Sequence, residues 1–263
     1  MPYRVDIRWP PPNALDLLVE LGALDIESFS DGLAAIMPDG VGRDTIAAAV
    51  GLDNVTVSPA IARDDGSIWL LSPRAVRVGS HLIASPEESA APEVLRLIDS
   101  NAFGTGHHPT TALCIEALEE ILNIEPLESV LDLGTGSGIL ALTALMMGVP
   151  RAVGLDIDAA ALRVAAANAR LNNLADRLQL VLGGPDVVHG NWPLVVANVL
   201  AAPLMEMAPV LVRRVGKRGR LVLSGIRWSL ESEVRQTYQH LGIRHIASKT
   251  RSGWTVLTGQ ASW

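Results

Sequence analysis

The chain has 263 residues, 49% of them hydrophobic, and carries a formal net charge of −7 at pH 7. This size and composition allow one large domain or two unequal domains with a buried core. The acidic balance argues against broad electrostatic binding of nucleic acid, which requires clustered lysines and arginines.

Three further features of the sequence bear on cellular location. The single cysteine, Cys114, excludes an internal disulfide and is typical of a reducing cytoplasm. The apolar run of residues 139–149 is too short to span a bilayer, and the N-terminus carries no signal-peptide pattern. We therefore expect a cytoplasmic protein that does not bind membranes.

The N-terminal residues alternate between strand and helix patterns. The order is strand, helix, strand, strand, helix, strand, over residues 3–9, 14–21, 24–29, 33–37, 43–50 and 54–60. Asn13 is the expected N-cap of the first helix, and Gly22 is expected to end it. This order predicts a small ferredoxin-like α+β domain, assigned to residues 1–62.

The next segment, residues 63–100, is predicted to be a linker that partly packs. It contains Pro73, Pro86 and Pro92 together with short strand patterns at residues 68–71, 75–78 and 81–84. The rest of the chain, residues 101–263, is predicted to be the second and larger domain.

From Val130 onward, strand and helix patterns alternate. Strands are predicted at residues 130–133, 152–156, 178–182, 194–197 and 220–224, and helices at residues 139–147, 159–171, 202–212 and 229–241. A hairpin of residues 244–247 and 254–258 follows. Such alternation predicts a mainly parallel sheet with helices on both faces, which binds ligands at the carboxyl ends of its strands. Asp132, Asp156 and Asn198 all lie at strand ends and are expected to face one crevice.

A glycine-rich turn follows the strand at residues 130–133. Gly134, Gly136 and Gly138 recur at every second position, a spacing that differs from the G-x-G-x-x-G of dinucleotide sites and argues against hydride chemistry. Asp132 precedes the turn, and Asp156 ends the next strand, where nucleoside-binding sheets place the carboxylate that binds ribose hydroxyls. The pattern favours a nucleoside cofactor over a tight turn that serves only packing.

A second polar segment covers residues 99–111. Gly104 and Gly106 bracket Thr105, and Pro109 occupies a first helical position, with Thr110 and Thr111 after it. The segment predicts either a polar pocket or simply a capped helix start. The adjacent His107 and His108 do not predict a metal site, because neighbouring side chains diverge and no further ligand stands at suitable spacing.

Asn198 is the polar end of an otherwise hydrophobic strand. Its amide is able to accept a hydrogen bond from an amine while donating to a cofactor. Taken alone, it is equally consistent with a turn that ends the strand.

Four motifs in order resemble those of the bacterial ribosomal protein L11 methyltransferases. They are Ala-Phe-Gly-Thr-Gly-x-His-Pro-Thr-Thr from residue 102, Asp-Leu-Gly-Thr-Gly-Ser-Gly-Ile-Leu from residue 132, Gly-Leu-Asp-Ile-Asp from residue 154, and Asn-Val-Leu-Ala-x-Pro-Leu from residue 198. The resemblance extends from about Val76 to the C-terminus. It implies a Rossmann-like, seven-stranded α/β domain that binds S-adenosyl-L-methionine (SAM), with a ferredoxin-like domain that presents the substrate. It also implies methylation of lysine side chains and an N-terminal amine of ribosomal protein L11, leaving S-adenosylhomocysteine.

The resemblance also implies roles for individual residues. Asn198 and Thr105 are the candidate catalytic residues, with Asn198 aligning the amine. The candidate cofactor contacts are Phe103, Gly106, Thr111, Asp132, Gly134, Gly136, Gly138, Asp156 and Asn198. No metal is implied, and we expect a monomer.

The sequence departs from the family pattern at three points. His107 replaces a residue that is usually threonine, the N-terminal domain is short, and Trp69 is the only tryptophan of the predicted linker. The alternatives are therefore a methyltransferase for another protein or a small amine, and a SAM-binding module without catalysis.

Overall fold

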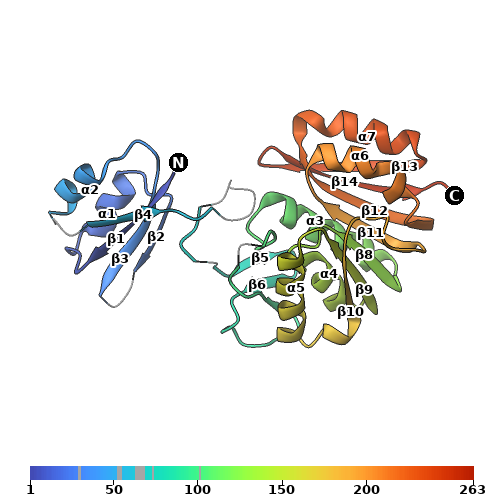
Figure 1. Ribbon diagram of the computed structural model, residues 1–263, viewed down its shortest axis with the longest axis horizontal. Coiled ribbons are helices and arrows are strands. Elements are labelled where there is room, and N and C mark those ends of the chain that lie inside the picture. The colour runs from blue at the N-terminus through green and yellow to red at the C-terminus, as the bar shows by residue number, and fades with distance from the viewer. Residues whose placement is uncertain (29–30, 52–54, 63–68, 73, 101) are drawn as a thin grey trace. The chain divides into compact units, whose positions relative to one another are not determined.

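The computed structural model describes residues 1–28, 31–51, 55–62, 69–72, 74–100 and 102–263. The chain forms two compact units, Met1–Pro73 and Arg74–Trp263 (Figure 1). Residues 63–68 of the predicted linker, which include the start of the strand pattern at 68–71, lie outside the described residues, as do residues 29 and 54 of the strand patterns at 24–29 and 54–60. None of the helices among the described residues is long and apolar enough to cross a membrane.

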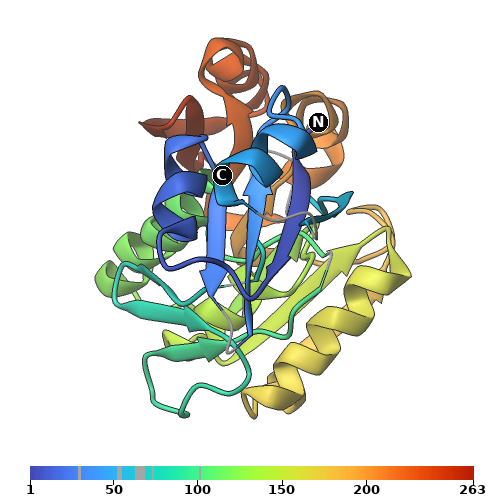
Figure 2. The same cartoon turned by 90° about the vertical axis from the view of Figure 1, so that its left-hand side faces the viewer.

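The first unit is a four-stranded antiparallel sheet with two helices (Figure 2). Its strands run in the order β2-β3-β1-β4, and each neighbouring pair is antiparallel. This is the ferredoxin-like topology, as predicted. The elements are β1 (Tyr3–Arg8), α1 (Ala14–Glu20), β2 (Asp25–Ser28), β3 (Gly32–Met37), α2 (Arg43–Val50) and β4 (Val55–Pro59).

Alternating side chains divide this sheet into two apolar faces. Val5 and Ile7 of β1 pack with Leu18 of α1 and Ile46 of α2. The other face, through Ile36 and its neighbours, packs against Trp69 and Leu71. The Leu71 backbone N–H donates to the buried carboxylate of Asp25 at 2.8 Å, so this short part of the predicted linker belongs to the first unit and forms no strand.

The two residues predicted to cap helix α1 lie at its ends, but only Gly22 has the expected geometry. Gly22 follows the helix with φ +83°, a conformation open to glycine, and this supports the predicted end. Asn13 is the N-cap residue, as predicted, but its side chain makes no capping hydrogen bond. Its place in the chain is right, but its φ of −97° and ψ of 6° are not the extended geometry from which an N-cap side chain reaches the helix amides.

The second unit is built on a seven-stranded sheet in the order β10-β9-β8-β11-β12-β14-β13. All pairs are parallel except those of β14, which is antiparallel to both neighbours. Strand order reverses between β8 and β11, the position at which such sheets bind ligands. The strands are β8 (Ser129–Leu133), β9 (Arg151–Asp156), β10 (Leu178–Leu182), β11 (Trp192–Asn198), β12 (Val215–Arg227), β13 (Ile243–Arg251) and β14 (Trp254–Ala261).

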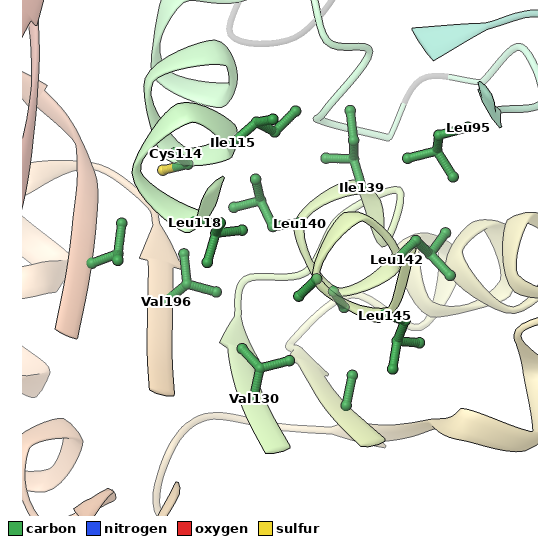
Figure 3. Close-up of a cluster of buried hydrophobic side chains, with 14 of the residues drawn as sticks. Leu95, Cys114, Ile115, Leu118, Val130, Ile139, Leu140, Leu142, Leu145 and Val196 are labelled. Atoms are coloured by element: carbon green, nitrogen blue, oxygen red, sulfur yellow. The ribbon is translucent and has the colours of Figure 1, made fainter. Parts of the chain in front are cut away.

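Helices cover both faces of this sheet, as the alternating pattern predicts. Helices α3 (Pro109–Ile124), α4 (Ile139–Met146) and α5 (Ala159–Leu171) pack on one face, and α6 (Ala201–Val212) and α7 (Glu231–His240) on the other. Short 3-10 turns cover Ala175–Arg177 and Trp228–Leu230. In the first layer, Leu118 of α3 and Leu140 of α4 lie beside Val130 and Val196 of the central strands (Figure 3). The strands that carry the site are therefore held between two apolar layers.

A small sheet precedes α3 and belongs to the second unit. It consists of β5 (Val76–Val78), β6 (His81–Ala84) and β7 (Val94–Arg96). Asn168 of α5 and Asn172, the C-cap of that helix, bind the last strand and the residues after it, accepting from the N–H groups of Ile98 at 2.8 Å and Arg96 at 3.0 Å respectively. Residues 74–100, expected to be linker, thus pack on the larger unit, and β7 was not predicted.

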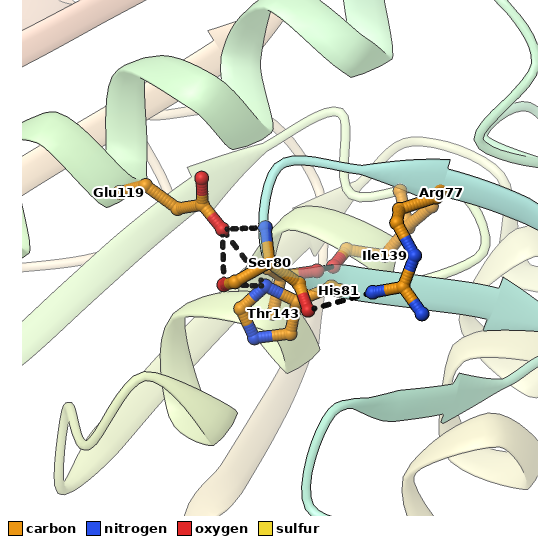
Figure 4. Close-up of polar contacts among 6 residues, drawn as sticks. All are labelled: Arg77, Ser80, His81, Glu119, Ile139 and Thr143. Carbon is orange, nitrogen blue, oxygen red and sulfur yellow. Dashed lines mark hydrogen bonds and ion pairs between the residues drawn. The ribbon is translucent and has the colours of Figure 1, made fainter.

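A polar cluster ties the β5–β6 turn to α3 (Figure 4). One oxygen of Glu119 accepts hydrogen bonds from the Ser80 backbone N–H at 2.7 Å and from the Ser80 hydroxyl, and lies 3.1 Å from Nδ1 of His81. Burial raises the pKa of Glu119, but the hydrogen bonds from Ser80 and the neighbouring His81 outweigh it, and the net pKa is lowered. The cluster therefore holds the small sheet against α3.

Replacing Glu119 with glutamine is expected to lower the free energy of unfolding by about 2 kcal/mol at neutral pH, because hydrogen bonds to a charged group contribute about that much. Since folding lowers the pKa of Glu119, this contribution is complete above the ordinary glutamate pKa of about 4.3 and is lost as the pH falls through the folded value. Urea unfolding of both proteins at neutral and acidic pH measures it. A difference that does not shrink in acid would contradict the assignment, and Glu120→Gln, at the exposed partner of Lys249, is the matched control.

Candidate functional site

The candidate site lies at the carboxyl ends of adjacent strands of the large sheet. β8 pairs with β9 on one side and with β11 on the other, so Asp132, Asp156 and Asn198 lie at the ends of three neighbouring strands. Between β8 and α4 the chain turns through Gly134, Gly136 and Gly138, with φ values of +68°, +56° and +83°. Side-chain-bearing residues rarely adopt this conformation, so the glycines are required by the backbone.

Gly136 links the turn to the neighbouring strand. Its N–H donates to Oδ2 of Asp156 at 2.9 Å, and Oδ1 of Asp156 accepts from the N–H of Asp158 at 2.9 Å. The carboxylate is half-buried, and each of its oxygens retains a further lone pair. Asp156 is therefore fixed in orientation by the loop and still able to bind hydroxyl donors.

Asp132 supports the same turn from inside. Its Oδ2 accepts from the Thr135 hydroxyl at 2.7 Å and from the Ala141 N–H at 3.1 Å, and the side chain is fully buried. Burial raises the pKa of Asp132 to about 6, against the effect of these two hydrogen bonds. Its other oxygen, Oδ1, is buried without a hydrogen-bond partner among the described residues. Asp132 thus braces the loop through Oδ2 and leaves Oδ1 without a partner among the described residues.

Ser137 joins the glycine turn to the second polar segment. Its N–H donates to the carbonyl of Phe103 at 2.9 Å, and its hydroxyl donates to the carbonyl of Gly104 at 2.6 Å. The carbonyl of Ser137 accepts from Asn168 Nδ2 of α5 at 2.9 Å. Sequence reasoning missed Ser137, because a serine within a glycine turn gives no signal of the distant carbonyls that it binds.

The segment around Thr105 is itself held by close backbone packing. Gly104 and Gly106 have φ values of +98° and +89°. A Cβ on Gly104 would lie 2.8 Å from the Ser137 hydroxyl, and one on Gly106 would lie 3.1 Å from Ile83 of β6. Thr105, half-buried between them, is carried by a loop that touches both the glycine turn and the small sheet.

Helix α3 begins at Pro109, the position predicted for its first turn. His108 is its N-cap, a role that the sequence reasoning did not assign. After Pro109 the helix continues with two threonines, Thr110 and Thr111, and Thr111 is fully buried. Its hydroxyl accepts a long hydrogen bond, 3.5 Å, from Nδ2 of Asn198.

Asn198 is the buried polar group at the end of β11. It is 7% exposed, and its Oδ1 has no hydrogen-bond partner among the described residues. The following residue, Val199, approaches the turn, since a Cβ on Gly134 would lie 2.5 Å from its Cγ1. An unpaired buried acceptor costs about 1–3 kcal/mol, so this oxygen is suited to a donor from a bound molecule.

The predicted site residues therefore gather around one sheet edge through three connections. Gly136 binds Asp156, Ser137 binds the carbonyls of Phe103 and Gly104, and Asn198 binds Thr111. Within the described residues, no three His, Cys, Asp or Glu side chains gather where they would hold a metal ion.

The strand order, with its single antiparallel strand β14, and the glycine turn with its paired acid define a Rossmann-like methyltransferase. The model of the ribosomal protein L11 methyltransferase family (PrmA) matches residues 64–262. The chain belongs to this family.

Individual relatives extend over most of the chain. The ribosomal protein L11 methyltransferase of Pelobacter propionicus is 35% identical over 241 residues, covering 89% of this chain and 75% of that protein. The relative of the same name from Shewanella sp. is 34% identical and covers 93% of each chain. The crystal structure of the ribosomal protein L11 methylase of Lactobacillus delbrueckii subsp. bulgaricus aligns with a TM-score of 0.66 and 27% identity, over 72% of this chain and all of that one.

Proposed function

We propose that this methyltransferase transfers methyl groups from SAM to amines of ribosomal protein L11, on lysine side chains, the N-terminus or both. The observation that carries the proposal is the buried, unpartnered Oδ1 of Asn198 at the reversal point of the sheet. An amide oxygen there accepts a hydrogen bond from an amine N–H. It is uncharged, so it orients the amine while stabilising the protonated form less than a carboxylate would.

The glycine turn fits the cofactor in both shape and charge. Glycines at 134, 136 and 138 keep this turn tight, because a Cβ at each position would collide with Val199, Phe103 or Ala165. The remaining lone pairs of Asp156 suit the ribose hydroxyls. The unpartnered Oδ1 of Asp132 suits a positively charged group, which would offset the burial that raises the pKa of this carboxyl. SAM carries ribose hydroxyls, an ammonium group and a sulfonium.

The chemistry requires little from the protein beyond alignment. When bound, SAM would supply an activated methyl group: the lone pair of the neutral amine would form the new N–C bond as the C–S bond breaks, and S-adenosylhomocysteine would leave. Because a free lysine has a pKa of about 10.4, the site must favour its neutral form by removing water. Asn198 then aligns the lone pair, Thr105 and Phe103 enclose the reacting groups, and Gly106 and Thr111 shape the cofactor pocket. Catalysis is mostly proximity and orientation.

The remaining parts of the proposal concern substrate delivery and location. We propose that the ferredoxin-like unit, Met1–Pro73, recognises the protein substrate, and that the chain works as a cytoplasmic monomer without direct contact to nucleic acid.

Incubating the pure protein with methyl-labelled SAM and purified ribosomal protein L11 is expected to add whole methyl groups to L11, as seen by intact-mass analysis. Calorimetry on the same preparation measures SAM binding independently. SAM binding without any mass increase would retain the cofactor and overturn the substrate, pointing to another protein, a small amine or a module without catalysis. Failure to bind SAM at all would overturn the cofactor assignment.

A further inference from the structure

His108 is a buried residue of segment 102–111 to which the proposed function gives no role. Its side chain is 1% exposed, and its Nδ1 accepts a hydrogen bond from the Thr110 backbone N–H at 3.3 Å, with the Thr110 hydroxyl 2.7 Å away. Because a backbone N–H can only donate, Nδ1 is an acceptor, and the proton of the neutral ring is on Nε2. His108 therefore caps α3 with an uncharged imidazole, which suits the positive end of a helix dipole.

The ring of His108 also separates two aromatic side chains from distant parts of the chain. Its centroid lies 5.6 Å from that of Phe103 and 5.0 Å from that of Trp254, the latter in an edge-to-face contact at 69°. Both distances are typical of favourable aromatic pairs. The Trp254 ring is covered in turn by the guanidinium of Arg227, 3.8 Å from the ring centroid. Trp254 begins β14, and Arg227 ends its neighbour β12.

Each of the three segments that meet at His108 carries part of the candidate site. The Phe103 segment is bound to the glycine turn by Ser137, and α3 places Thr111 on Asn198. β12 pairs with β11 and aligns Ser224 with Asn198. We propose that His108 is a positioning residue for methyl transfer. It holds three segments in fixed relative positions: the Phe103 loop, the start of α3, and the end of β12 with the start of β14. This inference rests on the proposed function for its kinetic test.

The two contacts of His108 can be removed separately. His108→Asn keeps a favoured N-cap acceptor but removes the ring between Phe103 and Trp254. His108→Phe keeps an aromatic ring but has no acceptor for the Thr110 N–H. A residue needed only for folding would lower the amount of folded protein, whereas a positioning residue lowers the rate of each folded molecule.

The test is methyl transfer to ribosomal protein L11 at saturating SAM, with kcat expressed per SAM-binding site counted by calorimetry. We expect kcat per site to fall about tenfold or more in both variants, because small misplacements of reacting groups have effects of this size or larger. The Kd for SAM is expected to stay within about threefold in His108→Asn, which leaves the glycine turn intact. Wild-type kcat per site in either variant would overturn the proposal. His245→Asn, at an exposed position of β13, is the control and is expected to behave as the wild type.

A second measurement separates this inference from the proposed function. If the unaltered protein transfers no methyl group to L11, the proposed function fails, and amide hydrogen exchange of residues 102–106 then tests His108. Loss of its ring is expected to accelerate exchange in this segment about tenfold in His108→Asn, while the helix amides of α7 stay protected. Unchanged exchange at residues 102–106 would overturn the positioning role.

Discussion

Replacing Asn198 with alanine is expected to lower kcat/KM for methyl transfer about 100-fold, because losing a group that aligns the reacting atoms has effects of that order. SAM binding, measured by calorimetry, is expected to weaken far less. The folded chain should remain stable, since Oδ1 of Asn198 has no hydrogen-bond partner to lose among the described residues and Nδ2 makes only the long bond to Thr111. Turnover and SAM binding both at wild-type levels would refute the role.

The variant Asn198→Asp tests whether methyl transfer needs an uncharged acceptor at this position. A carboxylate keeps the acceptor but favours the protonated amine, so its activity is expected to be low at neutral pH and to recover as the pH rises. Asn191→Ala is the matched control: this exposed asparagine directly precedes the other end of β11 and is expected to change neither activity nor SAM affinity.

Replacing Gly136 with alanine is expected to abolish measurable SAM binding. The φ of +56° at this position costs an alanine about 1–2 kcal/mol, and its Cβ would lie 2.5 Å from the Phe103 carbonyl oxygen. That contact cannot be relieved by a side-chain rotation, because it is with backbone. Relief requires the turn to move away from the Phe103 segment, which breaks the hydrogen bonds of Ser137 and the bond from the Gly136 N–H to Asp156.

The variant Gly148→Ala distinguishes the backbone strain of a positive φ from the steric collision that Gly136→Ala also introduces. Gly148 follows α4 with φ +99°, and nothing lies within 4 Å of a Cβ built there. The free energy of unfolding of Gly148→Ala is expected to fall through backbone strain by about as much as the strain lowers it in Gly136→Ala, whereas its SAM affinity is expected to stay at the wild-type value. Calorimetry and urea unfolding of both variants provide the comparison. Equal SAM affinity in Gly136→Ala and Gly148→Ala would show that the close approach to Phe103 is unimportant for the cofactor.

Local patterns in the sequence predict most elements of the fold. Helix α2, helix α5 and strand β10 have the bounds expected from their periodicity, and the ferredoxin-like order of the first unit follows from its six elements. These succeed because apolar spacing and glycine or proline punctuation act within a few residues. Strand β7 was missed because three residues are too few to show a periodic pattern. Its backbone becomes a strand by pairing with β6, which is not adjacent to it in the sequence.

The sequence by itself determined the order of the candidate motifs and, through strand ends, their approach to one edge of the sheet. It did not determine which groups hold them there. Ser137 on the Phe103 segment, His108 between two aromatic rings, and Glu119 on the β5–β6 turn are contacts between residues far apart in the chain. Their partners are backbone carbonyls, backbone amides and aromatic rings, and no local sequence pattern indicates which of these groups a distant side chain will contact. The tertiary structure decides this, because it sets the distances and directions between them.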